Sequence, residues 1–185
     1  MKARRRSAAS GALASGALAV VVSLLTVFEV SAAECRLSVS QPHIDYGPLR
    51  PGTTHDSRGI PLGKRVVRLN VTCPDDRLIA LRFRGVPADA QGFGFGRHGR
   101  FDVSLQQPLL DGQPMELAPM NSRTERSGQL RPDQALVVLK AGQPIAGRVF
   151  SAQVQVDAYL SHTAPAVRDK TLLEGGGRFE LVPGG

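Results

Sequence analysis

Residues 148–160 read RVFSAQVQVDAYL, and this stretch decides the fold class that the sequence predicts. Between residues 150 and 159 every second side chain is apolar, and the positions between them carry Ser, Gln, Asp or Tyr. The apolar members are Phe150, Ala152, Val154, Val156 and Ala158. A period of two is that of a β-strand with one buried face and one solvated face. The stretch therefore predicts a long strand in an antiparallel sheet.

Similar alternation elsewhere extends this prediction to the rest of the chain. Residues 64–73 alternate in the same way, with Cys73 as the last inward-facing side chain. Shorter strands are expected at residues 36–46, with an interruption at Pro42, and at residues 78–84, 101–105, 135–139, 167–173 and 178–182. The Pro-Asp-Asp run at residues 74–76 predicts a turn before a returning strand. Because no window beyond the first 33 residues shows a helical period, about seven to nine strands predict an all-β antiparallel sandwich.

The first 33 residues predict an export signal. Four basic residues lie between Lys2 and Arg6, an apolar stretch runs from Ala12 to Phe28, and small residues follow at 31–33. This pattern predicts cleavage after Ala32 or Ala33 and leaves residues 34–185 as one domain. An uncleaved anchor is the alternative, because about 17 apolar residues reach the lower limit for spanning a bilayer.

Much of the positive charge belongs to this amino-terminal segment. The chain carries 23 Lys and Arg against 16 Asp and Glu; without the segment's four bases and one acid, 19 and 15 remain and the net charge is +4. These charges are spread along strand faces and form no large basic cluster. We therefore expect no nucleic-acid partner.

The cysteines and histidines predict a disulfide and no metal site. Cys35 and Cys73 are the only cysteines, and an exported protein meets an oxidising compartment that favours their pairing. The four histidines are scattered singly, without the Cys-x-x-Cys or His-x-x-x-His spacing of metal ligands. We expect neither a metal nor a cofactor.

A glycine-rich segment at residues 85–100 predicts a mobile loop. Residues 94–99 match G-x-G-x-x-G, but a strand-like stretch follows where a nucleotide cradle requires a helix, so nucleotide binding is not expected. An alternative is that Phe93, Phe95, Arg97 and His98 form an exposed aromatic and basic tip that touches a host glycan or another surface. No grouping of Ser, His and Asp predicts an enzyme.

Taken together, these segments resemble a subunit of the bacterial fimbriae that the chaperone-usher pathway assembles. The resemblance rests on Cys35, on Ile-Asp-Tyr-Gly at residues 44–47, on residues 69–73 ending at the second cysteine, and on residues 172–175 and 178–182. It covers nearly all of the mature chain. It implies an immunoglobulin-like sandwich that lacks its last strand, in which Cys35 and Cys73 tie the first two strands together.

The resemblance also implies partners and a location. A sandwich without its last strand has an open edge, which a periplasmic chaperone and then a neighbouring subunit fill by donor-strand complementation. The partners expected are therefore this chaperone, an outer-membrane usher and other fimbrial subunits. Phe179 and Leu181 are the expected residues of the groove edge. The protein would pass through the periplasm to a fimbria on the cell surface, where it would contribute to adhesion.

The beginning of the mature chain differs from the pattern of this family. Polymerising subunits carry a donor segment ahead of the first cysteine, whereas one or two residues separate the predicted cleavage site from Cys35. A tip or initiating subunit, which accepts a strand without giving one, is expected on this basis. An earlier cut or a misassigned start codon would leave a donor segment in place. A second departure is Pro183-Gly184-Gly185, which stands where the family has an aromatic residue.

An alternative function remains open from the sequence. The chain could be a secreted or periplasmic β-sandwich that binds carbohydrate or a surface ligand through residues 92–100 and does not polymerise.

Overall fold

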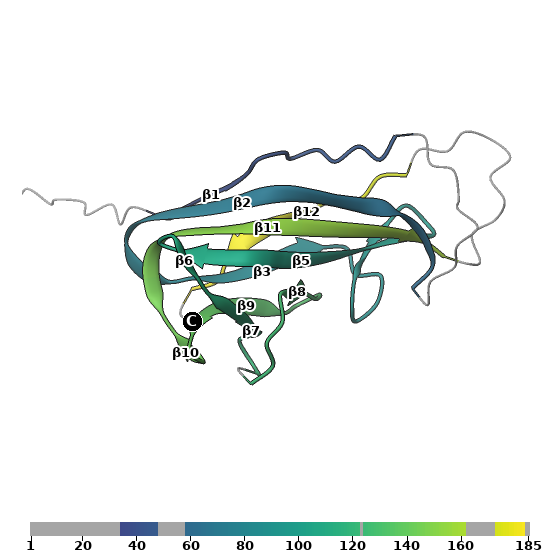
Figure 1. Ribbon diagram of the computed structural model, residues 1–185. Helices are drawn as coiled ribbons and strands as arrows, with labels where there is room; N and C mark the ends of the chain where they lie inside the picture. Colours follow the sequence, from purple (N-terminus) through teal and green to yellow (C-terminus); the bar gives the residue numbers. More distant parts are fainter. Residues whose placement is uncertain (1–33, 48–57, 123, 162–172, 184–185) are drawn as a thin grey trace, which may run out of the picture. The chain divides into compact units, whose positions relative to one another are not determined.

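The computed structural model describes residues 34–47, 58–122, 124–161 and 173–183 (Figure 1). All regular secondary structure in these ranges is β, which confirms the predicted all-β class. No helix in the described ranges is long and apolar enough to cross a membrane. The export signal expected at residues 1–33 and nearly all of the strand expected at residues 167–173 lie outside the described residues.

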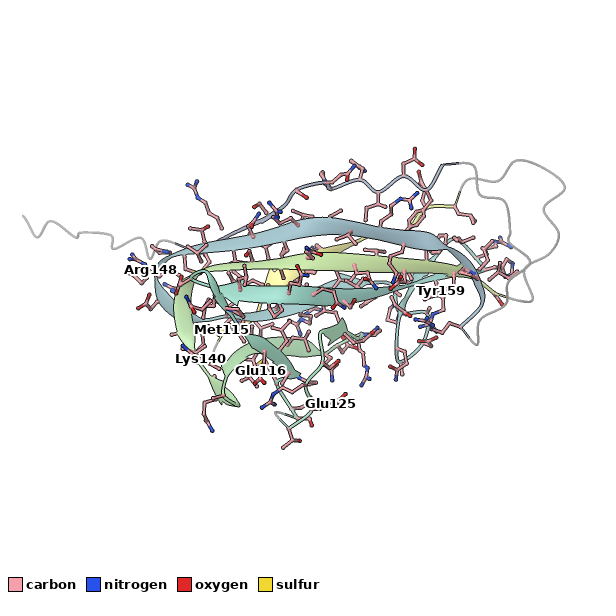
Figure 2. The ribbon with its side chains drawn as sticks, viewed as in Figure 1. Met115, Glu116, Glu125, Lys140, Arg148 and Tyr159 are labelled. Atoms are coloured by element: carbon pink, nitrogen blue, oxygen red, sulfur yellow. A yellow bond between two sulfur atoms is a disulfide. The ribbon has the colours of Figure 1, made fainter. Side chains whose placement is uncertain are left out.

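The larger sheet is built around two long strands. Its order is β1-β2-β11-β5-β4, and every pairing is antiparallel. The strands are β1 (Arg36–Val39), β2 (Ile60–Leu78), β11 (Ala146–Leu160), β5 (Gly99–Leu110) and β4 (Phe93–Phe95). The short strands β6 (Gln113–Pro114) and β8 (Gln129–Leu130) also pair with β5. The central strand, β11, is the one predicted from the alternation, and Figure 2 shows Arg148 and Tyr159 towards its two ends.

The smaller sheet has the order β10-β9-β3-β12, with β7 also paired to β9, and Figure 1 shows β3 and β12 behind the larger sheet. Its strands are β10 (Gln143–Pro144), β9 (Ala135–Lys140), β3 (Ala80–Gly85), β12 (Gly177–Leu181) and β7 (Glu116–Pro119). These pairings are antiparallel as well.

One apolar core lies between the two sheets. Inward-facing side chains of both sheets belong to it, among them Leu69, Val71, Val103, Leu105, Phe150 and Val154 of the larger sheet and Leu81, Phe83, Leu136 and Val138 of the smaller one. Each of these side chains is at most 8% exposed. The period of two therefore separates core from solvent, and the predicted antiparallel sandwich is confirmed.

The turn predicted at residues 74–76 is wrong. Residues 73–76 are part of β2 and lie opposite Arg148 alone, so they form a bulge in a continuous strand. Proline is tolerated at such a position because it needs no ladder hydrogen bond there. The Asp111 carboxylate supports the opposite strand by accepting a hydrogen bond of 2.8 Å from the backbone N–H of Val149. The chain instead changes sheets at Ile79, which is 1% exposed.

The start of the described chain is fastened to β2. Cys35 and Cys73 form a disulfide with an S–S distance of 2.05 Å, as the sequence predicts for an exported chain. The strand expected at residues 36–46 ends at Val39, and its predicted resumption after Pro42 is wrong. Ile44 and Tyr46 nevertheless pack against the core.

Candidate functional site

The two edge strands β1 and β12 lie next to each other but do not pair. β1 ends the larger sheet and is bonded to β2, and β12 ends the smaller sheet and is bonded to β3. Within the described ranges, neither strand has a second ladder partner. Some Cα atoms of β1 and β12 are within 8 Å of each other. One side of the sandwich therefore presents two adjacent unpaired edges, with β1 as the outermost strand of the larger sheet (Figure 1).

The ladder of β1 determines which of its backbone groups face this opening. The N–H of Ser40 donates a hydrogen bond of 2.8 Å to the carbonyl of Arg68, opposite β1. In an antiparallel ladder successive residues bond alternately to the two sides. The N–H and C=O groups of Leu37 and Val39 therefore point away from β2, towards the free edge.

The same alternation applies to β12. The N–H of Val182 donates a hydrogen bond of 2.9 Å to the carbonyl of Ala80, next to β3. The backbone groups of Phe179 and Leu181 therefore point away from β3. Both edges thus offer hydrogen-bonding groups that an added strand can satisfy.

Beneath these edges the apolar side chains are only half covered. Leu37, Val39, Phe179 and Leu181 pack against the core but keep intermediate exposure. The Phe179 ring lies 5.1 Å from that of Phe83 in an edge-to-face arrangement. The structure therefore places Phe179 and Leu181, expected from the sequence at a groove edge, on an edge strand that pairs on one side only, with their side chains towards the core.

The outer face of β12 carries a charged cluster that the sequence interpretation missed. Glu180 accepts hydrogen bonds of 2.7 Å from Arg84 Nε and 2.8 Å from Arg178 Nε. The hydrogen bond from Arg84, followed by that from Arg178, lowers the pKa of Glu180. Strand pairing brings Arg84 opposite Arg178, so Glu180 relieves the repulsion between them. Only the β3–β12 register could have identified this cluster.

The exposed aromatic tip expected at residues 93–98 is wrong for Phe93. This side chain is 1% exposed and lies on β4, where its pairing opposite Phe101 turns it into the core. Phe95 is half-buried, whereas Arg97 and His98 are exposed. The segment is also not simply a loop, because β4 and β5 form a hairpin across it.

The glycines that suggested a nucleotide cradle serve this hairpin. Gly96 has a φ of +55°, which favours glycine, and its N–H donates a hydrogen bond of 2.9 Å to the carbonyl of Glu174. A Cβ at Gly99 would lie 2.6 Å from the ring of Phe95. The glycines therefore permit a tight turn and close packing. Over the described ranges, no three His, Cys, Asp or Glu side chains gather in a way that could hold a metal ion.

Comparisons with known proteins give similarities in sequence and in fold. No family model matches the sequence. The chain is 27% identical over 157 residues to the "Putative uncharacterized protein YhcE" of Escherichia coli (strain K12), with 80% of this chain and 84% of that protein covered. Among solved structures, the P pilus rod subunit PapA is similar with a TM-score of 0.47 and 12% identity, over 83% of this chain and 94% of that one.

Proposed function

We propose that the chain is a non-enzymatic structural subunit of a surface fimbria, exported to the periplasm and completed there by a β-strand from another protein. The observation that carries this proposal is the pair of adjacent unpaired edges, β1 and β12, with half-buried apolar side chains beneath them. Unpaired edges of this kind template strand addition and promote aggregation until they are covered. The resemblance of the sequence to chaperone-usher subunits supports the same class of partner.

The distance between the edges indicates how a strand would enter. A strand between two others lies about 4.8 Å from each, which separates the outer two by about 9.6 Å. Some Cα atoms of β1 and β12 are within 8 Å of each other, so entry requires the strands to separate locally. The disulfide at Cys35 holds the beginning of β1 against β2. The hydrogen bond from Ser40 to Arg68 holds the other end, so β1 stays with β2 when the two edges separate.

The partners proposed are a periplasmic chaperone, an outer-membrane usher and a neighbouring subunit. Each donor would supply an extended segment with alternating apolar residues, because only every second side chain of a strand faces the core. Main-chain hydrogen bonds to both edges would hold the donor, and the half-buried row of Leu37, Val39, Phe179 and Leu181 would select its apolar side chains.

Photocrosslinking in the native bacterium tests this proposal. The photoreactive analogue p-benzoylphenylalanine replaces Phe179 at the edge or, as the control, Val86, which is 71% exposed. We expect mass spectrometry to identify a chaperone or subunit crosslinked at position 179 through an alternating extended segment, and no such crosslink at position 86. Equal crosslinking at both positions would contradict a role for the edge.

A matched pair of variants tests the apolar row in the same cells. Leu37→Lys places a charge among the half-buried side chains, whereas Ser38→Lys places it on the adjacent exposed position of β1. We expect Leu37→Lys to abolish the crosslink at position 179 and Ser38→Lys to preserve it. If the mature chain made alone in the periplasm were a stable soluble monomer without this crosslink, the alternative of a complete, non-polymerising binding domain would replace the fimbrial proposal.

A further inference from the structure

A polar pocket of about 350 Å³ lies beside β5 and the short strand β8 of the larger sheet. Three arginines line it, Arg58, Arg100 and Arg131, together with the carboxylate of Asp102 and neutral polar side chains. Among the described residues, Asp102 is the one charged residue that is buried, with 6% exposure. A buried carboxylate among cationic side chains marks a place whose chemistry differs from an ordinary solvated strand face.

The pocket forms where two short strands share one edge of β5. β4 pairs with β5 through Phe93 and Phe101, and β8 pairs with the same edge through Leu130 and Val103. Asp102 lies between these two contacts. The arrangement therefore interrupts the edge of the sheet beside a buried charge.

Glycine residues allow the backbone segments on both sides of the pocket to approach β5 closely. A Cβ at Gly92 would lie 2.4 Å from Asp102 Oδ1 and 2.6 Å from Arg100 Nη2. On the β8 side, a Cβ at Gly128 would lie 2.1 Å from the carbonyl oxygen of Leu105. Both segments bordering the pocket therefore reach β5 through residues without side chains, which keeps the arginines partly shielded from solvent.

Asp102 holds two of the arginine side chains in position. It accepts a hydrogen bond of 2.6 Å from Arg100 Nη2, and its other oxygen lies 3.4 Å from Arg58 Nη1. Arg100 Nη1 also donates to Asp89, and the Arg58 guanidinium lies 4.6 Å from the centre of the Tyr159 ring. Arg100 and Asp102 have side chains only 19% and 9% exposed. The carboxylate is thus fully engaged with cations and acts as their support.

Two donors in this pocket are buried without an acceptor. Over the described part of the chain, the Nε atoms of Arg100 and Arg131 have no hydrogen-bond partner. Arg131 Nη2 lies 3.9 Å from Oε1 of Glu125, and Figure 2 labels Glu125; this ion pair leaves Nε of Arg131 unsatisfied. Buried donors of charged groups are costly when unpaired, and native structures almost always supply a partner. Neither Nε–H group has an acceptor among the described residues, and each is shielded from solvent, so a ligand oxygen would bind to it after a small shift of the guanidinium group.

We propose that this pocket binds a small sugar-sized ligand carrying an oxyanion, that is, a carboxylate, sulfate or phosphate group. Guanidinium donors match these groups in geometry and charge. The side chains of Gln91, Ser127 and Gln129 complete the lining with neutral donors and acceptors suited to hydroxyl groups. The volume is at the lower end of that of small-molecule sites, about 300–1,000 Å³, so the ligand is small.

This binding site is independent of the proposed strand acceptance. The order of the larger sheet places β1 at one end and β5 with β4 at the other. A ligand seated on Arg100 and Arg131 therefore needs no contact with β1.

Side-chain NMR tests the pocket directly. The ¹⁵N-labelled mature chain, with its unlabelled donor strand bound where solubility requires it, is titrated with D-glucuronic acid, D-glucose 6-sulfate and D-glucose 6-phosphate, and with D-glucose as the neutral control. We expect at least one of the three acids to shift the Nε–H resonances of Arg100 and Arg131 in a saturable manner, and D-glucose to leave them unmoved. The acid that binds most tightly identifies the class of oxyanion. No saturable shift with any acid, or an equal shift with D-glucose, would overturn the proposal.

Variants separate the pocket from general surface charge. Arg131→Gln is expected to weaken binding by about tenfold or more, because a charge-assisted hydrogen bond is lost. Arg178→Gln removes the same charge from a side chain that is 76% exposed on β12 and should change affinity less than about twofold. Arg131→Lys, which keeps the charge but loses the planar fork, provides a second variant should the glutamine disturb folding, and it should also bind more weakly. Equal weakening by Arg131→Gln and Arg178→Gln would show a non-specific charge effect and refute the site.

Discussion

Replacing Phe93 with alanine is expected to destabilise the domain by about 3–5 kcal/mol. The side chain is 1% exposed, and its ring lies 4.8 Å from that of Phe83 and 5.7 Å from that of Phe101. Alanine would leave a cavity at this point of the core. The neighbouring backbone cannot easily collapse into it, because β4 is held in register by its pairing with β5.

Part of this loss belongs to the aromatic contacts themselves. The rings of Phe83 and Phe93 meet edge to face with an interplanar angle of 74°, a favourable geometry for aromatic pairs. A double-mutant cycle with Phe83→Leu and Phe93→Leu keeps most of the apolar volume and isolates the ring–ring term. We expect a coupling free energy of about 0.5–1.5 kcal/mol.

Urea unfolding of the oxidised mature chain, followed by circular dichroism at low protein concentration, measures these effects. With a slope of about 2 kcal/mol per molar urea, a loss of about 4 kcal/mol lowers the midpoint by about 2 M. His98→Ala in the exposed turn of the same hairpin is the control and should stay within about 0.5 kcal/mol of the wild type. If Phe93→Ala destabilised no more than His98→Ala, Phe93 would lie on a surface loop and the packing described for β4 would be refuted.

Three further changes have definite expected outcomes. Replacing Cys35 and Cys73 with serine should cost about 2–4 kcal/mol in the same urea assay, and an unchanged midpoint would contradict a stabilising clamp. The hydrogen bond from Arg84 lowers the pKa of Glu180. The stability that this group contributes is therefore present at neutral pH and is lost as the pH falls through the lowered pKa. NMR titration measures this pKa, and a value for Glu180 equal to that of an exposed glutamate would disprove the interaction. Burial raises the pKa of Tyr46, so its contribution to stability is present below its ordinary pKa of 10.0 and is lost as the pH rises through the raised value. Comparing the tyrosinate absorbance of the wild type with that of Tyr46→Phe checks this, and loss of an absorbance change centred at or below pH 10.0 would refute it.

The alternation of apolar residues predicted the long strands well because it reports a local and repeated constraint. Phe150, Ala152, Val154 and Ala158 are buried on one face of β11, as their spacing indicates. Val156 has the same phase but is only partly buried. A residue's phase in a strand therefore predicts the direction of its side chain, while the extent of its burial depends on what the opposite sheet places over it.

The predictions that failed depend on contacts between residues far apart in the chain. Pro-Asp-Asp at residues 74–76 suits either a turn or a bulge, and the pairing of the opposite strand, supported by the bond between Asp111 and Val149, decides for the bulge. Glycines at residues 85–100 suggested a loop, yet one of them, Gly85, leaves room for the buried ring of Phe93, because a Cβ there would lie 3.0 Å from its Cδ1. Local composition was ambiguous in both cases, and strand pairing selected one of two compatible structures.

The two candidate sites also differ in how far the sequence alone predicts them. Phe179 and Leu181 could be chosen from the sequence because residues 178–182 resemble the final strand of fimbrial subunits. The pocket on β5 draws Arg58, Arg100 and Arg131 from separate segments without any motif. It exists only because β4 and β8 pair with the same edge of β5.

Both sites lie at strand edges that the sandwich leaves incompletely covered. At the β1 end, the edge adjoins the other sheet's edge strand, β12, and the two leave apolar side chains half covered, which favours an extended peptide as occupant. At the opposite end, two short strands cover the edge of β5 incompletely and leave a gap beside a buried carboxylate, which favours a small polar ligand. The chemistry of each opening therefore depends on which side chains border it: apolar residues facing the core at β1 and β12, and outward-facing charged residues at Arg100 and Asp102. Because the long central strands β2 and β11 lie between β1 and β5 in the larger sheet, a donor strand at β1 and a ligand at β5 would occupy different surfaces of the domain.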